Sequence, residues 1–165
     1  MNSYVSVILP FLKKAGKLAL KNQSLITGCN KVDGSIVTET DLKLSKMFKK
    51  VINSNFENHF ILDEETALKT KNLKEKTYSS EYVWVIDPID GTKTYFHGSS
   101  FFAVSISLYK NLKPLFGALY LPILSIFFVP SWSIASKWRW VPSPPGLAFT
   151  FPVFPTFPIT VPCFT

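Results

Sequence analysis

The N-terminal segment carries apolar and basic side chains with the repeat of a helix. Apolar residues recur three and four positions apart from Val5 to Ala19, and the lysines of residues 13–21 fall largely on the opposite side. This pattern is typical of an amphipathic α-helix with one buried face. Pro10 lies within the pattern, so we expect the helix to kink or to begin there.

A second helix is predicted to start after Thr38. Thr38 precedes Asp41 by three positions, a spacing that resembles a capping box with Asp in place of Glu. Apolar residues at helical spacing follow and define the buried face, namely Leu44, Phe48, Val51 and Ile52. Residues 35–38, after a turn signal at Asp33-Gly34, are expected to be extended.

Further along the chain, short apolar runs predict strands. Residues 60–62 and 82–86 are continuous apolar runs of the kind found in buried strands. Residues 102–108 alternate with period two, and residues 115–120 are expected to pair back on them after a turn at 110–111. The predicted fold class is layered α/β, with the two N-terminal helices packed on a sheet built from residues near 36, 61, 84, 105 and 117.

The composition changes near residue 125. Eight of the twelve prolines lie after Leu124, and all eleven Asp and Glu residues fall between Asp33 and Asp90. Proline removes backbone donors and opposes both helix and central strand. We therefore predict a folded part at residues 1–124 and an irregular, Pro- and aromatic-rich tail at residues 125–165, which resembles translation in a different reading frame.

Charge, cysteines and hydropathy limit the partners. A formal net charge of +7 favours anionic ligands, but the lysines lie on helix-like segments without interleaved aromatics, so no nucleic acid is expected. Cys29 and Cys163 show neither disulfide-framework nor zinc spacing, which favours a reducing cytoplasm.

The uncharged residues 114–136 are long enough to span a membrane. Pro122 and Pro130 interrupt them, and we favour a buried strand followed by irregular chain.

Two acidic clusters each follow a predicted buried strand. Residues 63–65 read Asp-Glu-Glu, and the second cluster places Asp87 and Asp90 just before Gly91 and Thr92. Carboxylates at this spacing can converge on Mg²⁺, and two such ions can clamp a transferring phosphoryl group. The Gly-Thr amides can bind phosphate. Taken singly, each cluster also fits an ordinary polar turn. Together they favour a metal and phosphate site.

Four motifs resemble a known family in order and spacing. The strings KVDGSIVTETD, ILDEET, WVIDPIDGTKTYF and FFAVSISLY are similar to those of the inositol monophosphatase-like phosphatases, which include histidinol-phosphate phosphatases and bisphosphate nucleotidases. The resemblance spans residues 1–124. It implies a sugar-phosphatase-like α/β fold, and it implies Mg²⁺-dependent hydrolysis of a small phosphate monoester, such as an inositol phosphate, by metal-activated water.

The resemblance also implies metal ligands. Glu65 and Asp87 would hold a first Mg²⁺ with the backbone carbonyl of Ile89. Asp87 would bridge to a second ion shared with Asp90. Glu64 would lie in the outer coordination sphere, where it would orient the direct ligands.

Substrate and water contacts follow from the same resemblance. Gly91 and Thr92 would contact the substrate phosphate. Thr92 and Asp41 would orient the attacking water and are the expected catalytic pair. Lys31 would lie in an outer shell near the phosphate or a weaker metal position.

The chain departs from the family pattern in several places. Asp63 stands where the family usually has glycine, which would add a negative charge beside the ligands. Lys93 after the Gly-Thr pair leaves the substrate open among the family branches. The family's C-terminal half normally supplies another metal-binding aspartate, and no acid follows Asp90. A catalytically impaired, truncated member that keeps metal or phosphate binding is therefore the alternative. Uncovered apolar surface favours a homodimer or aggregation.

The two histidines lie outside these motifs. Neither His59 nor His97 occupies a position that requires an acid or a base, because metal-bound water needs no imidazole. Both are expected to be structural.

Overall fold

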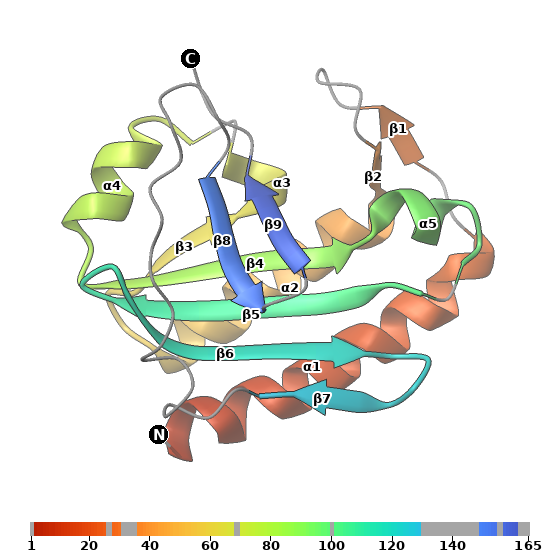
Figure 1. Cartoon of the computed structure of the whole chain (residues 1–165), viewed down its shortest axis with the longest axis horizontal. Helices are drawn as coiled ribbons and strands as arrows, with labels where there is room; N and C mark the ends of the chain where they lie inside the picture. Colours follow the sequence, from red (N-terminus) through yellow and green to blue (C-terminus); the bar gives the residue numbers. More distant parts are fainter. Residues whose placement is uncertain are drawn as a thin grey trace. The chain divides into compact units, whose positions relative to one another are not determined.

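The computed structural model describes residues 2–25, 28–30, 36–67, 70–99, 101–129, 149–154 and 157–161. They fall into two compact units, Met1–Val129 and Pro130–Thr165. The first unit combines helices with a mixed sheet (Figure 1), which confirms the α/β fold class.

A five-stranded sheet forms the centre of the first unit. Its order is β3-β4-β5-β6-β7, with β3 parallel to β4 and the other pairs antiparallel. The strands are β3 (Phe60–Asp63), β4 (Tyr82–Asp90), β5 (Ala103–Lys110), β6 (Lys113–Leu121) and β7 (Ile126–Phe128). Four of these strands coincide with the predicted apolar runs.

The fifth strand corrects the prediction. The extended residues near 36 were expected in this sheet, but β2 (Ile36–Thr38) pairs with β1 (Gly28–Asn30) in a separate two-stranded sheet. β2 is short and ends where the second helix begins, so the chain turns away before it can join the main sheet. β7, just beyond the expected boundary at Leu124, takes the fifth place.

Two long helices cover one side of the sheet (Figure 1). α1 (Asn2–Asn22) packs against β5 and β6, and α2 (Glu39–Asn55) packs against β4 and against α1. Their fully buried apolar residues recur at helical spacing, as predicted, and are Ile8, Leu12, Ala15, Ala19, Leu44, Phe48 and Ile52. Val51, expected on the buried face of α2, is only half-buried. Pro10 lies on the exposed side of α1 and does not end the helix.

The start of α2 has the predicted capping box. Thr38 N donates to Asp41 Oδ2 over 2.9 Å, and Asp41 N donates back to Thr38 Oγ1 over 3.3 Å. These bonds satisfy backbone donors that the first helical turn leaves without partners. The box also fixes the position of the Asp41 carboxylate.

The remaining segments of the first unit are short. They are η1 (Gln23–Leu25), α3 (Glu64–Ala67), α4 (Leu73–Ser79) and α5 (Thr92–Phe96). In the described part of the chain, no helix is both long and apolar enough to cross a membrane. The described portion of residues 114–136 lies mainly in strands β6 and β7.

The second unit contains a hairpin where irregular chain was predicted. β8 (Phe149–Phe154) pairs antiparallel with β9 (Phe157–Val161), and Pro152 lies opposite Pro158. A two-stranded hairpin has only edge strands, in which proline is tolerated because one side makes no ladder bonds.

His59 is structural, as expected. Its Nδ1 accepts a hydrogen bond of 2.9 Å from Trp84 Nε1, and its ring stacks on Tyr82 with centroids 4.3 Å apart. Burial lowers the pKa of His59. An accepting Nδ1 requires the neutral ring, so protonation breaks this contact.

Gly16 is required where α1 crosses β6. A Cβ at this position would lie 2.5 Å from Tyr120 Cε1 and 2.7 Å from Pro122 Cγ. A Gly→Ala change inside a helix normally stabilises by about 1 kcal/mol. We predict that Gly16→Ala instead destabilises by about 1–3 kcal/mol through overpacking, measured by urea unfolding. Lys17→Ala, on the exposed side, should be nearly neutral, and a stabilised Gly16→Ala protein would contradict this packing.

The His59 contact makes stability depend on pH. The pKa is lower in the folded state, so the unfolded chain takes up the proton first and stability falls as the pH drops below about 6.5. We predict that the difference in Tm between the protein and His59→Gln shrinks between about pH 7.5 and 5.5, since acid removes the histidine's advantage. A difference that stays constant would contradict this.

Candidate active site

The acidic residues gather because β3 and β4 are parallel neighbours. Asp63 pairs with Ile86, so the end of β3 lies beside the middle of β4, one residue before Asp87. Glu64 begins α3 directly after β3, and β4 carries Asp87 and Asp90 near its end. Parallel strands end at the same edge of a sheet, which is where open α/β folds place ligands.

The first turn of α2 and the start of α5 meet at this edge. Thr92 Oγ1 lies 3.4 Å from Asp41 Oδ1, and it donates a shorter bond of 2.8 Å to the carbonyl oxygen of Ile89. The predicted pair of Asp41 and Thr92 is therefore brought together. The Ile89 carbonyl keeps one lone pair for a further contact.

Gly91 makes the turn between β4 and α5. Its φ of +90° is in the left-handed region that favours glycine, and it immediately precedes the first helical residue, Thr92. A side chain there would also meet Thr94 Oγ1 at 3.0 Å from its Cβ. The glycine thus lets the backbone reverse within one residue of Asp90.

The carboxylates in this region act strongly on one another. Burial raises the pKa of Asp87 well above its usual range, and the charges of Glu64, Asp90 and Asp41 raise it further. Burial, followed by Glu64, also raises the pKa of Asp90. For Asp41, burial outweighs the hydrogen bonds from Thr38 and again raises the pKa.

Glu64 is the acid that influences all three aspartates of this group. Its charge raises the pKa of the three aspartates Asp41, Asp87 and Asp90. Glu65, which the resemblance assigned as a ligand, is also buried, and its backbone N–H donates to Asp63 Oδ1 over 3.2 Å. Because the two glutamates are adjacent and chemically identical, their pattern along the chain does not show which one faces the aspartates.

The donor set fits a hard divalent cation. Within the described residues, Asp87 Oδ1 and Ser105 Oγ are buried without a hydrogen-bond partner. These two residues are paired across β4 and β5, so their side chains share a face of the sheet. As the side chains stand, no three His, Cys, Asp or Glu residues of the described ranges form a cluster that would hold an ion. A cation would satisfy Asp87 Oδ1 and offset the mutual repulsion.

Comparison with known proteins agrees with this geometry. Residues 3–139 match the Inositol monophosphatase family. The chain belongs to the inositol monophosphatase family.

Individual relatives show how far the likeness extends. Inositol monophosphatase 2 of Solanum lycopersicum is 33% identical over 131 residues, which are 78% of this chain and 48% of that protein. The fructose-1,6-bisphosphatase/inositol-1-monophosphatase of Aquifex aeolicus is 38% identical over 92 residues, 56% of this chain and 32% of that protein. The crystal structure of extragenic suppressor protein suhB from Bartonella henselae superposes with a TM-score of 0.66 at 26% identity, covering 78% of this chain and 48% of that one.

The chain therefore spans about a third to a half of the length of these relatives. Of the residues expected near the site, Lys31 lies outside the described residues. All the others lie within the described part, with Asp41, Glu64, Asp87, Asp90 and Thr92 linked by the contacts and charges above.

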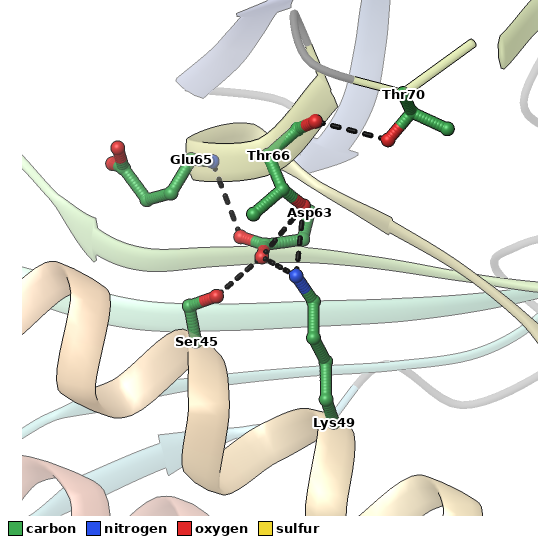
Figure 2. A network of polar contacts seen from close by, with 6 residues as sticks. All are labelled: Ser45, Lys49, Asp63, Glu65, Thr66 and Thr70. Carbon is green, nitrogen blue, oxygen red and sulfur yellow. Dashed lines mark hydrogen bonds and ion pairs between the residues drawn. The ribbon is translucent and has the colours of Figure 1, made fainter.

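The position of Asp63 corrects one expectation. Its charge was expected beside the metal ligands, but the side chain is fully buried against α2, where Lys49 Nζ lies 2.7 Å from Asp63 Oδ2 (Figure 2). Lys49 neutralises the carboxylate there, so the extra acid relative to the usual family glycine is paired locally.

The repulsion at Asp87 predicts a stabilising substitution. Because its pKa is raised in the folded state, ionised Asp87 lowers stability as the pH rises through that value. We predict that Asp87→Asn stabilises the metal-free protein by about 1 kcal/mol at pH 7.5, as is common for polar active-site residues. The gain should shrink as the pH falls and be lost below about pH 3.9, where both states hold the proton. Urea unfolding measures this, and a less stable Asp87→Asn protein would contradict it.

Proposed function

We propose that this inositol monophosphatase family member is a Mg²⁺-dependent phosphatase that hydrolyses a small phosphate monoester. The observation that carries the proposal is the buried, unpartnered Asp87 Oδ1 within a group of mutually repelling carboxylates. Next to it, the turn at Gly91 and the first residue of α5 offer amides for a phosphate. Metal-dependent phosphoryl chemistry needs both elements at one place.

Asp87 and Asp90 are the proposed side-chain ligands of the metal, with the Ile89 carbonyl beside them. Glu64 is the proposed third acid, in the role that the resemblance gave to Glu65, because Glu64 is the glutamate whose charge raises the pKa of Asp87. Glu65 supports the turn. A bound Mg²⁺ would supply charge for the phosphate oxygens and lower the pKa of a coordinated water.

Asp41 and Thr92 are the proposed catalytic pair. The Thr92 hydroxyl lies 3.4 Å from Asp41 Oδ1, so one water between the elements can reach both groups. Burial raises the pKa of Asp41, which makes it a better proton acceptor than an exposed aspartate. Asp41 would receive the proton of the attacking water while Thr92 holds that water in line, and the Gly91 and Thr92 amides would bind the phosphate.

The proposed substrate class is a phosphate on a sugar or cyclic polyol. This proposal is supported by the relatives, which are named as inositol monophosphatases and as a fructose-1,6-bisphosphatase/inositol-1-monophosphatase. The alternative is a chain that binds metal and phosphate without turnover, and phosphate release together with Mg²⁺ titration calorimetry separates the two.

The test is phosphate release from inositol 1-phosphate, histidinol phosphate and an adenosine bisphosphate, with and without Mg²⁺. We predict Mg²⁺-dependent release that falls at least about 100-fold in Asp90→Asn, since loss of even an outer-sphere partner costs about 10–100-fold. Glu75→Gln, an exposed acid of α4, is the matched control and should keep full activity.

Three outcomes are distinguishable. Release that needs Mg²⁺ and Asp90 supports the phosphatase. Mg²⁺ binding without release supports the alternative. Release that is equal in Asp90→Asn and the unsubstituted protein would contradict the proposed site.

A further inference from the structure

We infer that Asp63 is a positioning residue that clamps the Glu64–Glu65 turn to helix α2 and so fixes it relative to Asp41. This inference rests on the proposed function for its metal, but the clamp itself is a property of the chain without metal. Figure 2 shows the network, in which Asp63 receives contacts from α2 on one side and from its own turn on the other.

From α2, two residues reach the same oxygen. Ser45 Oγ donates a short hydrogen bond to Asp63 Oδ2, and Lys49 Nζ forms an ion pair of 2.7 Å with that atom. Asp63 has no exposed side-chain surface, whereas that of Lys49 is 32% exposed. The ammonium therefore sits at the rim of the network and neutralises a carboxylate that burial would otherwise penalise.

From the turn, Asp63 receives two further bonds. Its Oδ1 accepts the backbone N–H of Glu65 over 3.2 Å, and its Oδ2 accepts Thr66 Oγ1 over 3.1 Å. Lys49 Nζ also donates to Thr66 Oγ1 over 2.8 Å, which closes the network. The carboxylate thus holds the first residues of α3 with both oxygens.

The clamp connects to Asp41 through α2. Asp41, Ser45 and Lys49 follow one another at four-residue intervals, so they lie along one face of the helix. Asp41 and Ser45 are buried, and Asp41 is fixed by the capping box. One rigid helix therefore carries both an acid of the site and the groups that hold Asp63.

The consequence is a fixed spacing between two parts of the acidic group. Glu64 acts on Asp41 and Asp87, and such like charges tend to move apart if their supports are free to shift. Lys49 and Ser45 oppose this by tying α3 to α2. A glycine at position 63 would offer no carboxylate for any of these bonds.

The first test is hydrogen exchange of the metal-free protein. In Asp63→Asn, which keeps the shape but removes the charge, the amides of residues 64–67 should exchange at least about 10-fold faster, while those of β5 and β6 change little. Ser45→Ala, a milder substitution that keeps the ion pair, should shift the same amides in the same direction by less. Unchanged exchange, or an equal increase in every element, would overturn the clamp.

The second test is Mg²⁺ affinity by titration calorimetry. We expect Kd to rise about 10-fold or more in Asp63→Asn, the size of effect typical of groups that orient metal ligands. Glu81→Gln is the matched control, because it removes the exposed ion pair with Lys110 of 3.3 Å and should leave Kd unchanged. A Kd in Asp63→Asn equal to that of the control would overturn the positioning role.

The two proposals fail in different ways. If the unsubstituted protein binds no Mg²⁺, the proposed function fails, and hydrogen exchange alone decides whether Asp63 holds the turn. If it binds Mg²⁺ and Asp63→Asn binds as tightly, the proposed function stands and the positioning role is wrong.

Discussion

The parallel pairing of β3 with β4 is the constraint on which the site depends. In the described residues of the main sheet, it is the one parallel pair, and its register sets Asp63 opposite Ile86. One residue further along the chain come Glu64, the first residue of α3, and Asp87 of β4, and Glu64 raises the pKa of Asp87. A shift of one residue would turn the side chains of β3 to the other face and would separate the two acids.

Repulsion among these acids lowers the stability of the folded state, and the buried apolar core of the first unit offsets this loss. The helices α1 and α2 bury a continuous apolar face against the sheet, and Trp84 lies fully buried beneath them. Lys49 neutralises Asp63, whose side chain points toward α2. The remaining carboxylates repel one another, and a divalent cation that relieved this repulsion would bind more tightly for that reason.

The sequence predicted the parts of the fold that depend on local pattern. Helical spacing of apolar residues located α1 and α2, and Thr38 and Asp41 form the predicted capping box. The pairing partner of each strand was harder to predict, because a strand of three residues such as β2 has too short a hydrophobic pattern to show which sheet it joins. The fifth place in the sheet went to β7, which lies where proline and loss of charge suggested irregular chain.

Within the site, the sequence motifs named residues that the fold brings together, but they did not show in which direction the side chains point. The motif spacing selected Asp41, Asp87 and Thr92, which the fold does place near one another. It did not show that Glu64 is the acid against Asp87, or that Asp63 turns toward α2. Both depend on how the side chains rotate at the end of β3 and on Lys49, fourteen positions earlier in the chain.

The most direct test of the central claim is a crystal structure of the chain soaked with Mn²⁺, a redox-stable substitute for Mg²⁺ that scatters X-rays anomalously. The account predicts an anomalous peak bounded by the carboxylates of Glu64, Asp87 and Asp90. A fully occupied Mn²⁺ peak elsewhere, with these three carboxylates unmoved, would contradict it.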